Sequence, residues 1–283
     1  DLYIGNYIDR NLFSQIHQWA LTSLIMLIYI IVSVLIVSKY LQIFSKYERK
    51  TSIFSAAPGA LGPLLILAED EKSDLSQVAT SHLIRLIIII TFFPFIVNSF
   101  YDVENIKNAE ELIKDQNIFH LILLVISSII LIIIFDKFRI PAALLSGTLF
   151  ASGSLQIADI ASYQLPPNII DYCLLILGSS VGCRFADKTF SEIARNALHS
   201  FVATFLLVIL GLLAALAASV IIDKNFFTLL LSYCPGGIYE VAVIAIFFDL
   251  DPEFVSFHHI IRLLMILFIV PLMLKLIERK NLN

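Results

Sequence analysis

One stretch of the sequence joins a helix-breaking motif to an ionisable side chain. Residues 232–240 read Ser-Tyr-Cys-Pro-Gly-Gly-Ile-Tyr-Glu, so Glu240 closely follows Pro235, Gly236 and Gly237. Proline removes a backbone donor and glycine allows a sharp turn, so this motif frees backbone polar groups. Such groups can coordinate an ion or a small solute where protein or water surrounds them. The alternative is a packing kink that lets two helices approach closely.

Three ionisable residues accompany the motif. His259 and Arg262 are three residues apart and would share one helix face. A histidine can change charge near neutral pH, and a guanidinium can hold a carboxylate or phosphate with two hydrogen bonds. Glu240 would carry a proton or bind a cation, or it would be the structural partner of Arg262 or His259. The arginine, in turn, would alternatively extend to the lipid headgroups.

The same residue types recur 177 positions earlier, without a gap, which indicates an internal duplication. Apolar similarity alone would not align proline, glycine, histidine and arginine in one register. The position that matches Glu240 is Pro63, so the two halves are not equivalent. We predict that both copies contribute to a substrate- or ion-binding site, whose candidate residues are Ser55, Pro58, Gly59, His82 and Arg85 in the first copy and Ser232, Pro235, Gly236, Gly237, Glu240, His259 and Arg262 in the second.

These residues lie in a chain suited to a lipid bilayer. Hydrophobic residues make up 59% of the 283 positions and charged residues 15%, whereas soluble domains have about 45–50% and 25%. The apolar runs are long enough for helices that need about 20 residues to cross the membrane. Runs of isoleucine exclude the alternation that a membrane β-barrel requires. The predicted fold class is therefore an all-α, polytopic helical membrane protein with the bilayer as its main partner.

The duplication divides the chain into a first repeat (1–100), a polar linker (101–117) and a second repeat (118–283). The predicted segments of the second repeat are 118–135, 140–160, 168–184, 197–222, 228–248 and 254–277, and those of the first are 18–44, 52–68 and 76–100. The first two segments of the second repeat have no counterparts in the first, and the third is matched only near its end, where Gly182 corresponds to Gly5. We therefore expect the first repeat to lack about two spans at its N-terminus.

The basic residues predict the orientation of the repeats. Lysines and arginines concentrate on the cytoplasmic side of membrane proteins. Basic clusters lie near residues 39–50, 137–139, 184–195 and 275–280. They all fall on one side of the membrane only if the Pro-Gly segments re-enter the membrane rather than cross it. An odd number of crossings per repeat would then place the repeats in inverted orientation, with the C-terminus in the cytoplasm. A spanning second Pro-Gly segment remains the alternative.

Other functional classes find little support in the sequence. We recognise no nucleotide-binding loop or catalytic triad and expect a protein that is not an enzyme, with no cofactor, no metal and no nucleic-acid partner. The three cysteines, Cys173, Cys183 and Cys234, lie in apolar stretches and form no disulfide framework. Asp74 and Asp251 are predicted to cap the helices that follow them.

The second copy resembles the signature of the membrane AbrB family, which is unrelated to the soluble DNA-binding regulators of the same name. That pattern corresponds here to Ser232, Pro235, Gly236, Gly237, Glu240, Ala242, Ala245, Asp251, Val255, His259, Arg262 and Pro271. The stretch IPAALLSGTLFASG, from Ile140, is a looser match to the family's proline-led span. The first copy departs from the pattern, because Ala-Pro-Gly-Ala-Leu-Gly-Pro lacks the second glycine and the glutamate.

The resemblance implies a duplicated membrane domain whose relatives are described as transporters, regulators or ammonia monooxygenases. We expect a secondary transporter that lies in a bacterial inner membrane and couples the movement of a small solute to H⁺ or Na⁺. In one version of this hypothesis the solute is an anion. The alternatives are a membrane regulatory or scaffold protein and, with less support, a membrane-bound monooxygenase. The sequence also leaves open self-association into a homo-oligomer.

Overall fold

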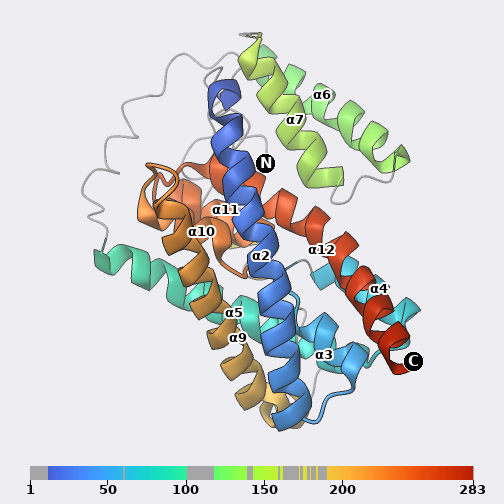
Figure 1. Cartoon of the computed structure of the whole chain (residues 1–283). Helices are drawn as coiled ribbons and strands as arrows, with labels where there is room; N and C mark the ends of the chain where they lie inside the picture. Colours follow the sequence, from blue (N-terminus) through green and yellow to red (C-terminus); the bar gives the residue numbers. More distant parts are fainter. Residues whose placement is uncertain are drawn as a thin grey trace.

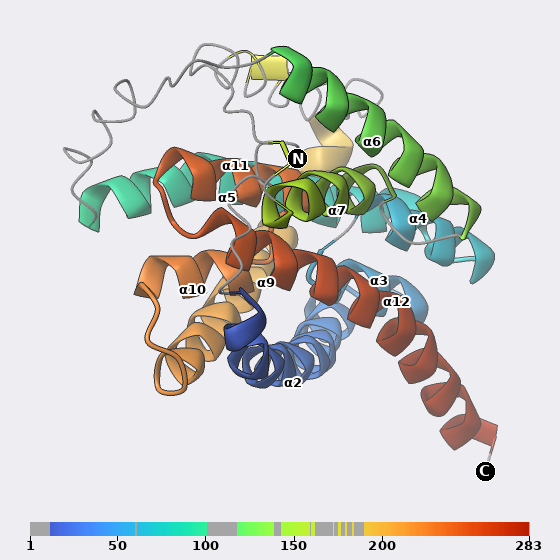
Figure 2. The same cartoon turned by 90° about the horizontal axis from the view of Figure 1, so that it is seen from above.

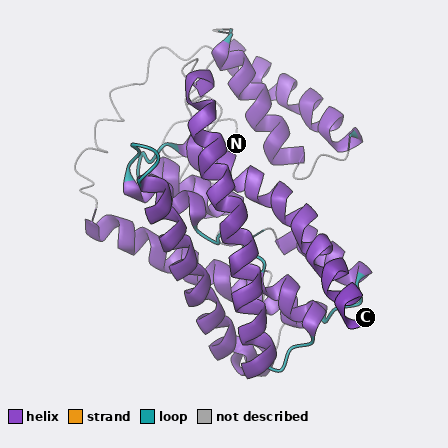
Figure 3. Ribbon diagram, viewed as in Figure 1, coloured by secondary structure: helices purple, strands orange, loops and turns teal. Residues whose placement is uncertain are grey.

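The computed structural model describes residues 12–59, 61–100, 118–138, 143–158, 160–161 and 190–282, with isolated positions between 162 and 189. Every regular element within these residues is a helix (Figure 3). The ten helices are α2 (Leu12–Phe44), α3 (Arg49–Ala56), α4 (Leu61–Asp70), α5 (Leu75–Phe100), α6 (Ile118–Lys137), α7 (Ala143–Ile157), α9 (Phe190–Ser219), α10 (Phe226–Tyr233), α11 (Ile238–Phe247) and α12 (Pro252–Leu282). The predicted helical fold class is confirmed.

Five of these helices are long and apolar enough to cross a bilayer. The candidate spans are Trp19–Phe44, Leu75–Phe100, Ile118–Lys137, Ala197–Ser219 and Pro252–Leu276. Many large apolar side chains on these helices point away from the protein interior. An aqueous protein would pay heavily in free energy for such a surface, whereas lipid tails solvate it. The chain is therefore an integral membrane protein.

Two further segments are each divided into a pair of short helices. α3 ends at Ala56 and α4 begins at Leu61, with Pro58 and Gly59 between them. α10 ends at Tyr233 and α11 begins at Ile238, with the sequence Cys-Pro-Gly-Gly between them. Neither pair contains a helix long enough to span the bilayer by itself. Each interruption therefore places non-helical backbone among the long helices.

The long helices α2 and α9 pack against each other and run in opposite directions (Figures 1 and 2). The predicted 177-residue offset pairs these two helices, and the predicted inverted orientation of the repeats would require such an antiparallel arrangement. α5 packs against α9, and α12 packs against α2, so each of them contacts a long helix of the other predicted copy.

One continuous hydrophobic core joins the two halves. It includes Trp19 and Met26 from α2, Phe54 from α3, Tyr233 from α10 and Phe254 from α12. Because residues from both predicted repeats share this core, neither repeat would bury its apolar surface alone. The broken segments are thus held between long helices contributed by both halves.

α6 and α7 form a helical hairpin at the upper side of the molecule (Figure 1). Gly147 lies against the backbone of Ile132, where a Cβ would come within 2.9 Å of the backbone nitrogen. This close approach explains the glycine in an otherwise apolar span. The predicted segment 168–184, the linker 101–117 and most of the basic cluster 184–195 lie outside the described residues or side chains.

Candidate functional site

The first helix break is held by two side chains of α5. The Arg85 guanidinium donates from Nη1 to the Ala57 carbonyl and from Nη2 to the Ser55 carbonyl, both at 2.6 Å. One turn earlier, His82 Nε2 lies 3.0 Å from the carbonyl of Phe54. These are the carbonyls at the end of α3, which the break leaves without helical partners. α5 therefore supplies the hydrogen bonds that the interrupted helix has lost.

The second break is held by the corresponding residues of α12, although Arg262 bonds to one carbonyl, that of Gly236, whose counterpart is Gly59 rather than Ser55. Arg262 donates to the Cys234 carbonyl through Nη1 and to the Gly236 carbonyl, at 2.6 Å, through Nη2. His259 Nε2 lies 3.0 Å from the carbonyl of Leu231. Each of these histidine and arginine residues lies 177 positions after its counterpart at the first break. The two breaks thus share one chemical solution to the same backbone problem.

Arg262 also contacts its neighbour on the helix. Its Nη2 lies 2.9 Å from Nδ1 of His259, which must accept this hydrogen bond. Nε2 of His259 faces a carbonyl and must therefore carry the hydrogen. This pattern assigns the neutral Nε2–H tautomer, and protonation of Nδ1 would break the contact with Arg262. The histidine is a positioned donor in this structure rather than a free proton carrier.

These hydrogen bonds revise the sequence interpretation of both arginines. Arg85 and Arg262 are buried, so neither extends to the lipid headgroups. The terminal nitrogens of both side chains bind backbone carbonyls, so the expected two-pronged grip on a carboxylate or phosphate is already occupied. Sequence spacing could not reveal this, because the acceptors are main-chain atoms on other helices.

The two breaks lie against the opposite halves of the molecule. Gly59 has a φ of +143°, a conformation that favours glycine. A Cβ at Gly59 would lie 3.1 Å from Nε and Nη2 of Arg262. At the other break, a Cβ on Gly236 would lie 3.2 Å from Ile89 of α5. The glycines therefore allow each break to pack closely against the long helix of the other copy.

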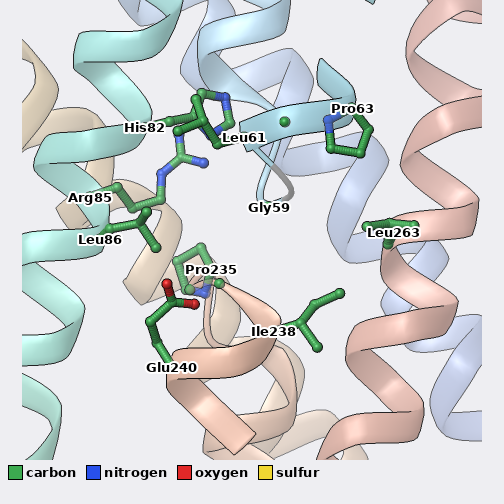
Figure 4. A pocket seen from close by; sticks show the side chains of 13 residues that line it. Gly59, Leu61, Pro63, His82, Arg85, Leu86, Pro235, Ile238, Glu240 and Leu263 are labelled. Carbon is green, nitrogen blue, oxygen red and sulfur yellow. The ribbon is translucent and has the colours of Figure 1, made fainter. Parts of the chain in front are cut away.

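A pocket with a volume of about 270 Å³ lies between the two breaks (Figure 4). Residues of both predicted copies line it, namely Gly59, Leu61, Gly62, Pro63, His82, Arg85, Leu86, Pro235, Gly236, Gly237, Ile238, Glu240 and Leu263. The volume is slightly below the range of about 300–1,000 Å³ that is typical of sites for drug-sized ligands. The pocket therefore suits a solute smaller than most drug-sized ligands, since a cavity of about 150 Å³ already holds a benzene molecule.

The two helices that begin at the pocket differ at their first turns. Glu240, in the first turn of α11, folds back so that a Cβ on Gly237 would overlap its Oε2 atom. In Figure 4 this carboxylate points across the pocket toward Arg85 and Leu86. The first turn of α4 carries Pro63 at the matching position. Apart from the chain neighbours of Gly62 and the backbone of α4 itself, no described atom lies within 4 Å of a Cβ built on Gly62. One helix start is filled by a carboxylate, and the other is open.

The structure brings most of the predicted site residues to this pocket. Its lining includes Gly59, His82, Arg85, Pro235, Gly236, Gly237 and Glu240. Arg262 and His259 lie behind this lining and fix the second break. Pro58 is not among the lining residues, and the two serines contribute differently from what we expected. The Ser55 carbonyl accepts from Arg85, and the Ser232 hydroxyl donates to the carbonyl of Thr228.

Sequence reasoning missed the apolar lining. Leu61, Leu86, Ile238 and Leu263 were not proposed, although leucine and isoleucine side chains form much of the pocket wall. The duplication contained the signal: Leu86 and Leu263 are 177 positions apart, as are Leu61 and Ile238. Leu86 and Leu263, which directly follow the recurring arginines, could have been added on that basis.

Other ionisable groups have structural roles. The carboxylate of Asp74 accepts a hydrogen bond from the Gln77 amide, so it caps α5 as predicted. Asp251 lies at the N-cap position directly before Pro252, where its carbonyl accepts from the Val255 amide, as predicted. Its carboxylate pairs with Lys224 at 3.2 Å, which ties the start of α12 to the loop before α10. Within the described part of the chain, no three His, Cys, Asp or Glu side chains gather as a metal site would need.

Comparisons with known proteins extend over nearly the whole chain. The sequence profile of the AbrB family, described as transition state regulatory protein AbrB, matches residues 2–278. The uncharacterized protein YhjN of Bacillus subtilis (strain 168) is 23% identical over 287 aligned residues, which cover 95% of this chain and 74% of that protein. No solved structure matches the chain. Both matches include the two breaks and the helices that hold them.

Proposed function

The chain belongs to the AbrB family, and from this premise we propose that it is a secondary transporter that carries a small solute across the membrane. The observation that carries the proposal is the pocket between the two breaks, which residues of both halves line. Interrupted helices in corresponding positions of two repeats are a common basis for substrate sites in secondary transporters. The predicted inverted orientation of the repeats is part of this proposal.

The architecture suits alternating access. Each break packs against a long helix of the opposite half, through Gly59 on Arg262 and Gly236 on Ile89. A rocking motion of one half against the other would therefore change the contacts at the pocket itself. The carbonyls of each break remain bonded to an arginine of the same half, so the broken backbone can move with its own helix.

We assign Glu240 a role in coupling. It is a buried carboxylate in the pocket lining, where it can bind a proton or a cation during the transport cycle. The copy-one counterpart is a proline, so the second half alone would carry this function. H⁺ and Na⁺ are the candidate coupling ions, and the bacterial cytoplasmic membrane, with the C-terminus inside the cell, is the proposed location.

The test is uptake into proteoliposomes. A broad panel of small carboxylates, amides, amines and sugars is first screened for compounds that raise the thermal stability of the purified protein, because a ligand of the folded state stabilises it by mass action. Labelled hits are then offered to vesicles with an imposed pH or Na⁺ gradient. We expect gradient-driven accumulation, and we expect Glu240→Gln to abolish the response to the gradient.

Glu71→Gln is the matched control. Glu71 is exposed to solvent and pairs with Lys50 at 2.7 Å, away from the pocket lining. The same chemical change should leave accumulation intact there. If no compound binds or moves, the transporter proposal fails, and the regulatory role named in the family description becomes the better hypothesis.

A further inference from the structure

The buried charges at the centre of the molecule do not balance. Among the described residues, the buried Arg, Lys, Asp and Glu side chains are Arg85, Arg262 and Glu240, which are 2%, 1% and 8% exposed. Two arginines and one glutamate leave an excess of at least one positive charge, because a proton on Glu240 or on a buried histidine would only increase that excess. An unmatched charge in a protein interior within a bilayer is costly. A bound anion with one negative charge would restore the balance.

The backbone adds to this positive potential at the pocket. Both α4 and α11 begin at its lining, so the positive ends of two helix dipoles face the same space. At α11 the carboxylate of Glu240 folds over Gly237 and occupies that end. At α4 the corresponding residue, Pro63, offers no carboxylate, and the space beside Gly62 is open. The uncompensated end is therefore the start of α4.

A third observation comes from Arg85, which lines the pocket between these two helix ends. Its terminal nitrogens bind the carbonyls of Ser55 and Ala57, but its buried Nε–H has no partner among the described atoms. A buried donor without an acceptor is unfavourable by about 1–3 kcal/mol in typical cases. Nε of Arg262, which lies beside Gly59, is likewise buried without a partner. Both donors are shielded from solvent, so an anion in the pocket would accept from either of them only after a small shift of the surrounding side chains.

We propose that the solute is a small monocarboxylate whose carboxylate binds at the start of α4, beside Gly62 and within reach of Arg85. There it takes the place in the first half that the carboxylate of Glu240 takes in the second. This inference rests on the proposed transport function and specifies its substrate class. The walls formed by Leu61, Leu86, Ile238 and Leu263 suit a short apolar body behind the carboxylate.

The experiment compares compounds that differ only in charge. Butyrate, butyramide and butylamine form one set, and benzoate, benzamide and benzylamine form a second. Binding to the purified protein is measured by thermal stabilisation and by isothermal titration calorimetry. We expect stabilisation by at least one carboxylate and none by its amide or amine. Binding of the amides or amines in preference to the carboxylates would overturn this inference while leaving the transport proposal standing. Failure of every compound here and in the broad panel would overturn both.

Two variants test the location. Pro63→Glu places a carboxylate at the position that matches Glu240, where it would occupy the open end of α4, and glutamate is well accepted in the first turn of a helix. We expect Pro63→Glu to bind the carboxylates at least ~10-fold more weakly than Pro63→Gln, because two like charges in a buried site repel strongly. The uncharged Gln variant controls for the loss of proline and for side-chain size.

Glu240→Gln should have the opposite effect, because it raises the excess positive charge and frees the start of α11. We expect tighter carboxylate binding in this variant even though its coupled transport is lost. Equal carboxylate affinity in Pro63→Glu and Pro63→Gln would overturn the assignment to the start of α4. Weaker binding in Glu240→Gln, in a protein whose thermal unfolding is unchanged, would overturn the charge argument.

Discussion

The two helix breaks are alike in how they are held and different in what they present to the pocket. Both direct carbonyls at the end of a terminated helix, or in the break itself, toward an arginine and a histidine on the long helix that follows. They differ one turn later, where the first has Ala60 and Pro63 and the second has Gly237 and Glu240. The shared residues solve a structural problem, because broken backbone in a membrane needs partners. The residues that differ determine the electrostatic character of the pocket.

A second difference lies at the contacts between halves. His258 of α12 bonds to the Thr22 hydroxyl of α2 at 2.8 Å and packs against Phe254. The matching residue in the first copy is Ser81, whose hydroxyl lies 3.4 Å from that of Ser200 on α9. Each contact joins a long helix to a long helix of the other half. The second copy makes the stronger contact, so the two interfaces are expected to contribute unequally to stability.

The largest effect is expected where the breaks are alike. Arg262→Met leaves the carbonyls of Cys234 and Gly236 without their donors, and each unsatisfied buried carbonyl costs about 1–3 kcal/mol. We expect a loss of several kcal/mol in the free energy of unfolding, seen as a lower midpoint in thermal unfolding of the detergent-solubilised protein. Arg85→Met should lower the free energy of unfolding by less. Arg85 bonds to two carbonyls but not to His82, whereas Arg262 also bonds to His259.

Arg262→Lys sharpens this test. It keeps the positive charge but loses the planar fork that reaches two carbonyls at once. A lysine variant as stable as the original protein would show that charge alone matters and that the carbonyl contacts contribute little.

A smaller effect is expected where Glu240 fills the start of α11. Gly237→Ala makes the second break resemble the first at this position, but the new Cβ would overlap the Glu240 carboxylate. Such overpacking typically costs about 1–3 kcal/mol. The backbone φ of Gly237 is −74°, so the substitution causes no backbone strain of its own. Because the clash is with a side chain, the cost should largely disappear in the Glu240→Ala background. A cost that stays the same in both backgrounds would contradict the contact.

Removing either of the contacts between halves should lower the free energy of unfolding. The two losses should differ by about the contribution of one hydrogen bond. Thr22→Val keeps the side-chain volume but removes the hydrogen bonds of the hydroxyl to His258 and to the Trp19 carbonyl, and it should lower the free energy of unfolding by about 1–2 kcal/mol. Ser81→Ala should cost less, because its contact with Ser200 is long at 3.4 Å. Thermal unfolding of both variants in the same detergent measures the difference. A larger loss in Ser81→Ala would reverse the ranking of the two interfaces.

The smallest effect on stability is expected at the open end of α4. Gly62→Ala places a methyl group where no described atom outside its own helix turn and chain neighbours lies within 4 Å. Alanine is favoured over glycine in a helix by up to about 1 kcal/mol. Stability should therefore be unchanged or slightly higher, while solute binding falls because the methyl group takes space from the pocket. Thermal unfolding and calorimetric binding measured on one preparation separate the two outcomes. Unchanged binding would indicate that the solute does not approach Gly62.

Several features of the site could be predicted from particular residues. The repeated proline and glycine at 58–59 and 235–236 located both interruptions, because few other residues stop an apolar helix so sharply. The His-Arg pairs at 82 and 85, and at 259 and 262, were recognised as important because they recur in register. Their roles could not be predicted, since main-chain carbonyls are present at every position and leave no mark in a sequence.

The sequence by itself determined that the chain is a helical membrane protein, where its helices are interrupted and which residue types accompany each interruption. These properties follow from local chemistry: the length of apolar runs, the missing donor of proline and the missing side chain of glycine. Only the tertiary structure decided that Gly59 rests on Arg262, that both breaks line one pocket and that Glu240 fills one helix start while the space beside Gly62 stays open. Such arrangements depend on how distant helices pack across the two halves, and packing is a property of the whole folded chain rather than of any one segment.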